Sequence, residues 1–164
     1  MDCVSQAVSE DAIQIEIVHG HADYTADELL EQAQANAQAL ILATVRFLLD
    51  GSAGVETWAT ALGNLFARAW GEAGPWEAGV LLDAMLTNYR ALGARVISVH
   101  LASAVAEAVI TGFPDSDLCT LFAVSADEAA GFHQVATVIA QQRDLTWSWQ
   151  VNGDQTHFTV TRAR

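Results

Sequence analysis

Cysteine and histidine are the residue types in this chain that could carry nucleophilic chemistry. Cys119 is followed along the chain by His133 and His157, either of which could act as its base. A catalytic thiolate needs a basic neighbour or a helix N-terminus to lower its pKa, whereas Asp115 and Asp117 beside Cys119 would act in the opposite direction. Two hypotheses stay open: Cys119 is a small buried apolar residue, or it works with His133 or His157 in a hydrolase-like enzyme.

Two further pairs of polar residues could do chemistry. Ser148 and His157 are expected to lie opposite each other in a hairpin, as a nucleophile and its base would, although nothing nearby marks an oxyanion hole. His19 and His21 share a face in extended chain, with Asp23 nearby, and are the candidate ligands for zinc or copper. No further ligand is close in sequence, so we predict no metal site and name no cofactor.

Large aromatic side chains fall on the expected apolar faces of helices and strands. Such residues either fill the core or line a cavity for an apolar ligand, because small-molecule pockets combine apolar walls with few polar groups. The sequence contains no glycine-rich phosphate loop, CxxC pair, HExxH or GxSxG motif. The candidate ligand-binding residues are Trp58, Phe66, Phe132, Trp147, Trp149 and Phe158.

Length and charge restrict the class of protein. The chain has 164 residues, 52% of them hydrophobic, which predicts one folded domain over 1–164 with a flexible leader at 1–12. The net charge of -13 argues against a nucleic-acid binder. Residues 1–45 hold eight carboxylates and no arginine, so this acidic quarter either solubilises the chain or forms a docking surface for a basic protein, as a nucleic-acid mimic would.

Cysteine content and hydropathy bear on the compartment. The chain has two cysteines, too few for a disulfide scaffold, and it starts with acidic rather than basic residues. The longest apolar stretch, 39–49, is interrupted by Thr44 and Arg46 and is shorter than a membrane span. We therefore expect a cytoplasmic protein with no membrane span.

The hydrophobic periodicity predicts helices first and mainly strands later. Alternation at 13–17 predicts a short strand, and Thr25 with Glu28 forms a capping box that begins a helix ending at Asp50. That helix is expected to bury a stripe running from Leu29 through Leu40 and Val45 to Leu48. The other expected elements are helices at 55–70 and 75–92, strands at 95–101 and 105–112, a helical turn at 118–122 and a helix at 125–143.

A final hairpin follows from the turn signal Asn152-Gly153, which favours a type I′ turn. That turn pairs Trp149 with Thr156 and Trp147 with Phe158, and gathers the large apolar side chains on one face. The fold class predicted is α+β: N-terminal helices packed on a four-stranded antiparallel sheet, with β-β-α-β-β order in the C-terminal half.

Local motifs in the C-terminal two thirds add a family resemblance. The second strand runs into Gly112-Phe113-Pro114, Gly131-Phe132 lies in the helix before the hairpin, and the hairpin turn leads through 153–158. In these features and in element order the chain resembles the four-vinyl-reductase-like (V4R) ligand-binding domains, which are related in fold to the TRAPP transport subunits and the haem nitric-oxide sensors. Phe113 and His157 stand where that family often has cysteine, so the resemblance implies no thiol-dependent metal site.

Three functions remain as hypotheses. The first, which the resemblance also implies, is a non-enzymatic small-molecule-binding or accessory, regulatory protein with an aromatic-lined apolar cavity. The second is the hydrolase-like enzyme, to which the related aminothiazoline-carboxylate hydrolases also point. The third is the acidic docking module. Apolar residues beyond one buried stripe further predict a homodimer formed through the N-terminal helices.

Overall fold

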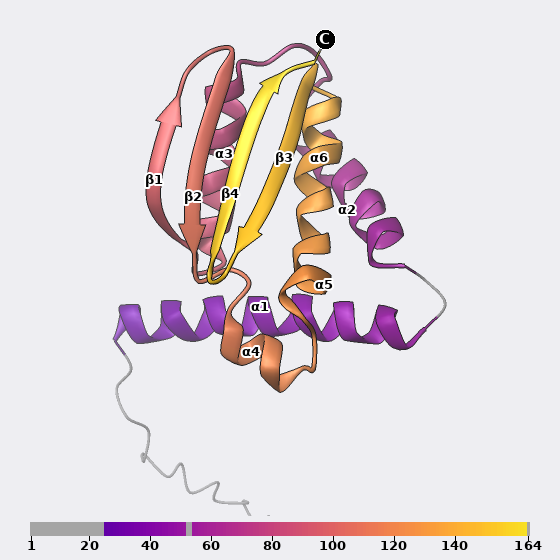
Figure 1. Cartoon of the computed structure of the whole chain (residues 1–164), viewed down its shortest axis with the longest axis vertical. Coiled ribbons are helices and arrows are strands. Elements are labelled where there is room, and N and C mark those ends of the chain that lie inside the picture. Colours follow the sequence, from indigo (N-terminus) through magenta and orange to yellow (C-terminus); the bar gives the residue numbers. More distant parts are fainter. Residues whose placement is uncertain (1–24, 52–53, 164) are drawn as a thin grey trace, which may run out of the picture.

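Helices cover one face of an antiparallel sheet in this protein, and a long helix crosses beneath the sheet (Figure 1). The computed structural model describes residues 25–51 and 54–163. The sheet has the order β1-β2-β4-β3, with β1 at Arg95–Leu101, β2 at Val105–Thr111, β3 at Leu145–Asn152 and β4 at Gln155–Arg162. The α+β fold class and the strand order along the chain are confirmed. The strand expected at 13–17 lies outside the described residues.

The helices lie close to their expected positions. They are α1 (Ala26–Asp50), α2 (Val55–Ala69), α3 (Ala78–Ala91), α4 (Ser116–Leu121), α5 (Ala126–Ala130), the 3₁₀ turn η1 (Gly131–His133) and α6 (Gln134–Gln141). No helix in the described ranges combines the length and hydropathy needed to cross a bilayer. The α3 helix packs on β1, β2 and β4, while α6 packs on β3 and carries α2 on its outer side.

The long helix α1 begins where its capping box predicts, but it buries only part of the predicted face. Thr25 and Glu28 form the reciprocal cap. The buried residues are Gln38, Leu42 and Val45, whereas Leu40, which was expected inside, is 71% exposed. The prediction was wrong because apolar residues occur all round this helix, so that hydropathy alone could not show which side meets the rest of the protein.

Two other helical predictions need correction. Pro75 was expected in the first turn of α3, but the helix begins at Ala78, where the N–H of Ala78 donates to the carbonyl of Ser103 and that of Gly79 to Ala102. The helix expected over 125–143 is divided by the η1 turn. A Cβ atom at Gly131 would lie 3.0 Å from the side chain of Val55, so α2 approaches the chain closely at this turn.

The final hairpin forms on the predicted face but in a different register. Its turn residues are Gly153 and Asp154, one position later than expected, so Trp149 pairs with Phe158 and Trp147 with Val160. The pairings expected from an Asn152-Gly153 turn were therefore wrong by two residues. A shift of two leaves each side chain on the same face, which is why the predicted apolar face was nevertheless correct.

A buried glutamine fixes α1 against the end of the sheet. The amide nitrogen of Gln38 donates to the carbonyls of Leu92 (2.7 Å) and Gly112 (3.0 Å), and its amide oxygen accepts from the N–H of Asp115 (3.0 Å). Gln38 is 5% exposed. One side chain thereby links α1 to the loop before β1 and to the loop after β2.

A buried arginine joins the C-terminal ends of α2 and α6. The guanidinium of Arg143 donates to the carbonyls of Ala67, Trp70 and Gly71, and it lies 4.9 Å from the ring centroid of Trp76. Cations are favourable at this position because the last carbonyls of a helix carry partial negative charge. Arg143 has no exposed surface, so these carbonyls and the indole take the place of water around its charge.

We expect Gln38→Ala to lower the free energy of unfolding by about 2–4 kcal/mol. The substitution leaves two carbonyls and one N–H without their partner, and each buried unsatisfied group costs about 1–3 kcal/mol before water re-enters. Gln32→Ala on the same helix is the control, because Gln32 bonds only to the exposed Asn36. Urea unfolding measures both variants, and equal losses would contradict the role assigned to Gln38.

Candidate ligand pocket

An apolar pocket of about 450 Å³ lies between α2 and α3, with α6 behind it and α1 at one end. The α3 helix sits on the β1 side of the sheet and α6 on the β3 side, so the two helices cover different halves of the sheet. The lining residues are Ile41, Leu62, Phe66, Trp70, Met85, Asn88, Tyr89, Ala91, Leu92, Phe132, Val135 and Ile139.

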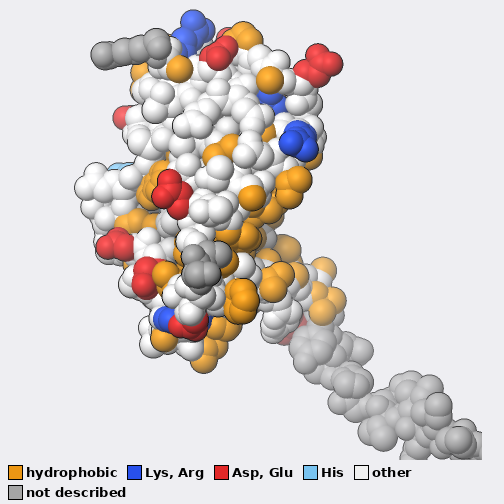
Figure 2. Space-filling model, turned by 90° about the vertical axis from the view of Figure 1, so that its right-hand side faces the viewer, with side chains coloured by type: hydrophobic (Ala, Val, Ile, Leu, Met, Phe, Trp, Pro, Cys, Tyr) orange, Lys and Arg blue, Asp and Glu red, His pale blue; other side chains and the backbone are white. Residues whose placement is uncertain are grey.

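Helical spacing places the walls of the pocket. On one side of α2, Leu62 and Phe66 lie four residues apart. Trp70, the C-cap of this helix, continues the same spacing. Val135 and Ile139 repeat this spacing on α6. The α2 helix thus packs on α6, and α6 packs on β3, while an edge of each apolar stripe faces the pocket. Figure 2, a view from the side on which α2 lies, shows hydrophobic side chains gathered across the middle and lower part of the surface.

The lining offers very little polarity. Asn88 is its one side chain with an amide, and the amide nitrogen already donates to the carbonyl of Ala84 at 2.9 Å. None of the described residues that line the pocket is charged. A ligand that fits here must therefore be apolar over most of its surface and does not gain an ion pair.

Tyr89 and His133 form a buried polar pair at the inner wall. The Tyr89 hydroxyl and Nδ1 of His133 are 2.7 Å apart, and both side chains lie among the rings of Phe113 and Phe158. Nε2 of His133 has no hydrogen-bond partner. Burial lowers the pKa of His133 to about 3 and raises the pKa of Tyr89, so both groups are neutral at physiological pH.

The six aromatic residues proposed from sequence as ligand-binding separate into two groups. Phe66 and Phe132 line the pocket, with Phe66 44% exposed at its rim. The other four do not line it. Trp58 packs behind Phe132 with ring centroids 6.0 Å apart, while Trp147, Trp149 and Phe158 belong to the inner face of the sheet and to the core around it.

Sequence reasoning missed most of the lining, although the pattern contained a signal. Leu62, Phe66 and Trp70 are spaced to fall on one side of the helix expected at 55–70, and Met85, Tyr89 and Leu92 on one side of the helix expected at 75–92. A stripe shows which side of a helix faces inward. It does not show that two such helices stand apart, because that separation is set by the sheet beneath them.

Cys119 occupies a different region. It is 6% exposed, packs with Leu42, Val45 and Val124 beneath the sheet, and borders a more polar hollow of about 400 Å³. Burial raises the pKa of the thiol, and the carboxylate of Asp115 raises it further. A thiol in these surroundings stays protonated and is a poor nucleophile.

The other candidates for catalysis do not converge on Cys119. His133 lies in the aromatic cluster described above, and His157 lies on the exposed outer face of β4. Ser148 pairs with Thr159 rather than with His157, so the expected nucleophile and base pair is not formed; its hydroxyl donates to the Thr159 carbonyl at 3.3 Å.

The remaining candidates from sequence involve the N-terminal segment. His19 and His21 lie outside the described residues, as do five of the eight carboxylates of the acidic quarter: Asp2, Glu10, Asp11, Glu16 and Asp23. The other three, Asp27, Glu28 and Glu31, lie at the exposed start of α1. Within the described ranges, no three His, Cys, Asp or Glu side chains are grouped to hold a metal ion.

Comparison of the chain with family models, with curated proteins and with solved structures gives no match.

We expect the free energy of unfolding to fall as the pH is lowered from about 6.5 to about 3. The unfolded chain takes up a proton on His133 near the ordinary histidine pKa of 6.5, whereas the folded protein does not do so until about pH 3. Each unit of this difference is worth about 1.4 kcal/mol, so the loss reaches several kcal/mol.

Denaturant titrations at a series of pH values measure this effect. His133→Asn should flatten the decline between pH 6.5 and 4, whereas the same substitution at the exposed His157 should leave it unchanged. Identical pH profiles for the two variants would show that His133 does not control acid stability.

Proposed function

We propose that this protein is a non-enzymatic, cytoplasmic binding or regulatory protein that holds a small apolar molecule in the pocket between α2 and α3. The pocket itself carries the proposal: a volume of about 450 Å³ with an almost wholly apolar lining suits a drug-sized or smaller ligand. The resemblance to V4R-like ligand-binding domains points the same way. The protonated state favoured for Cys119, and its separation from both candidate histidines, favour binding over hydrolysis.

We also propose that two copies associate through α1. At about 100° per residue, Leu29, Leu40 and Phe47 fall within about 20° of one another, on the side of α1 opposite Gln38 and Val45. These three side chains are 56%, 71% and 75% exposed. A second copy related by a two-fold axis would cover this stripe with the same stripe, as in most homodimers.

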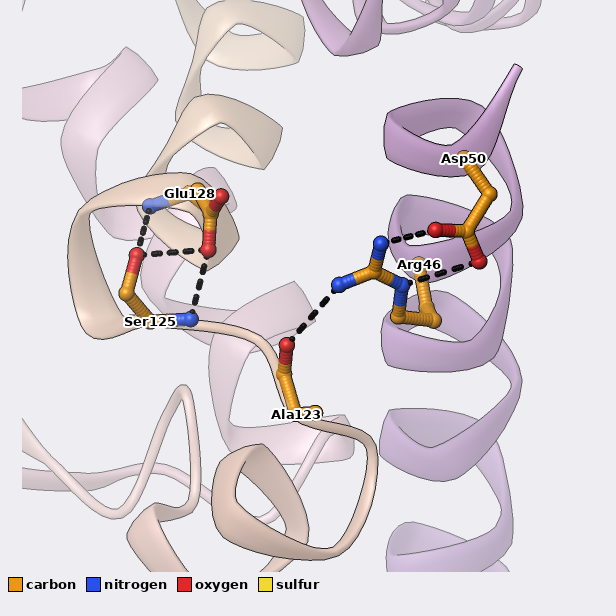
Figure 3. A network of polar contacts seen from close by, with 5 residues as sticks. All are labelled: Arg46, Asp50, Ala123, Ser125 and Glu128. Atoms are coloured by element: carbon orange, nitrogen blue, oxygen red, sulfur yellow. Dashed lines mark hydrogen bonds and ion pairs between the residues drawn. The ribbon is translucent and has the colours of Figure 1, made fainter.

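The distribution of charge on α1 suits this arrangement despite the net charge of -13. Residues 32–45 contain no charged side chain. Near the end of the helix, Arg46 and Asp50 form an ion pair, and Nη1 of Arg46 also donates to the Ala123 carbonyl at 3.1 Å, as Figure 3 shows. Two helices crossing near Leu40 would therefore meet through uncharged surface.

We expect Phe66→Ala to weaken binding of a neutral apolar fluorophore, N-phenyl-1-naphthylamine, by about 5- to 30-fold. The substitution removes most of one aromatic wall, and this range corresponds to about 1–2 kcal/mol of lost apolar contact. Fluorescence titration measures the affinity, and energy transfer from Trp70 in the lining reports the location of the probe.

The matched control is Leu65→Ala. Leu65 directly precedes Phe66 on α2, it is 59% exposed, and it does not line the pocket. Equal affinities in Phe66→Ala, Leu65→Ala and the unchanged protein would mean that the probe binds elsewhere, and no binding up to its solubility limit would contradict the proposed function.

We expect Leu40→Glu to convert a dimer into a monomer, because a two-fold axis near this position brings two buried carboxylates together. Light scattering should give about twice 17.5 kDa for the unchanged protein and 17.5 kDa for the variant. The control is Val105→Glu, which should remain dimeric. Val105 is 43% exposed and lies on the face of the sheet that the helices do not cover, away from α1. A monomeric unchanged protein at micromolar concentration would disprove the dimer.

A further inference from the structure

The outer edge of β1 is open in the described part of the chain. In the order β1-β2-β4-β3, β1 is hydrogen-bonded to β2 on one side alone. The edge contains no proline and no lysine, which are devices that commonly prevent further pairing. Its backbone groups can therefore accept another strand.

The side chains along this edge are apolar and incompletely covered. Val99 and Leu101 belong to the face of the sheet that carries α3, since they pair with Ala108 and Ala106. These two alanines are 2% and 0% exposed, whereas Val99 is 50% and Leu101 46% exposed. Ile97, at the irregularity between Val96 and Ser98, is 57% exposed. One more strand with apolar residues on this face would cover them.

The N-terminal end of α1 lies on the same side of the molecule as β1 (Figure 1). Two hydrogen bonds fix it there: the side-chain amide of Gln34 donates to the Arg90 carbonyl at 3.0 Å, and that of Gln38 to the Leu92 carbonyl at 2.7 Å. Arg90 and Leu92 lie directly before β1 in the chain. The start of α1 therefore lies near the Arg95 end of this strand.

The preceding segment has the sequence properties that the edge requires. Ile13-Gln14-Ile15-Glu16-Ile17 alternates apolar and polar residues, as a strand covered on one face does. Residues 18–25 connect it to α1, and eight extended residues span up to about 26 Å. Because this connection enters α1 beside the start of β1, the segment would run antiparallel to β1.

Charge also favours this segment. A hollow of about 480 Å³ at the start of β1 is lined by Arg90 and Arg95 together with Gln34 and Gly93. Residues 1–24 contain five carboxylates and no lysine or arginine. A tethered segment acts at an effective concentration of about millimolar, which exceeds the concentration of a second copy in a micromolar solution.

We propose that residues 13–17 pair antiparallel with β1 as a fifth strand of the sheet. Ile13, Ile15 and Ile17 then cover Val99 and Leu101, and Glu16 lies on the opposite face, toward the Arg95 end. The N-terminal segment thereby closes the open edge and keeps it from pairing with other chains.

Hydrogen exchange of the full chain tests this pairing. The amides of β1 that point away from β2 should exchange more than about tenfold faster in Ile15→Asp than in the unchanged protein. Gln14→Asp is the matched control, since it adds the same charge to the face that does not meet the apolar side chains. It should preserve the slow exchange, while amides of β4 should be unaffected in both variants.

Three results would overturn the proposal. One is rapid exchange of the outward β1 amides in the unchanged protein. Another is equal protection of these amides in the unchanged protein and in a chain lacking residues 1–18. The third is protection that increases with protein concentration, because this would identify a second copy as the partner of β1.

Discussion

The arrangement around the pocket depends on one buried cation, the guanidinium of Arg143. It is held by the last carbonyls of α2 and by the face of Trp76 rather than by a carboxylate. The backbone around it is also fixed, since the N–H of Gly74 donates to Gln142 and that of Trp76 to Arg143 itself. These contacts hold α2, α6 and the segment leading into α3 in one unit, which sets the distance between the walls of the pocket.

Close approach between α2 and α6 determines where the remaining space lies. A Cβ atom at Gly63 would lie 2.7 Å from Cβ of Val138, so α2 lies nearer to α6 than a larger residue would allow. Because α2 lies against α6 and α3 lies against the other half of the sheet, the unfilled volume is between them. The aromatic core below, including Tyr89 and His133, fills the sheet side and gives the pocket a rigid inner wall.

Local signals predicted local structure well. The capping box at Thr25 and the strands expected at 95–101 and 105–112 appear in the structure close to their expected positions, because each depends on neighbours within a few residues. The hairpin register was wrong because Gly153 and Asp154 form the turn, although Asn152-Gly153 is a strong turn signal by itself. The strand β4 also pairs with β2, and this second pairing restricts the register of β4 with β3. A short stretch of sequence around the turn does not contain that information.

The candidate site was less accessible to prediction from sequence. From the sequence, Arg143 was placed at the end of a helix and was given no role. Its partners are main-chain carbonyls, which leave no pattern in the sequence. The buried face of α1 was assigned only in part because Gln38, a polar residue, makes the decisive contacts while Leu29 and Leu40 are exposed. Polar residues that satisfy distant backbone groups are recognisable only when the elements they join are in place.

The strand order has a consequence for the kinetics of folding. Each hairpin, β1 with β2 and β3 with β4, closes over a short turn, whereas the seam between β2 and β4 joins Ala106 to Val160 and Ala108 to Phe158 across the α4–α6 segment. Closing that long loop has the larger entropic cost, so we expect β2 to pair with β4 after each hairpin has formed. The seam is lined on its inner face by Ala106 and Ala108, which are 0% and 2% exposed, so its formation buries these alanines together with Val160 and Phe158.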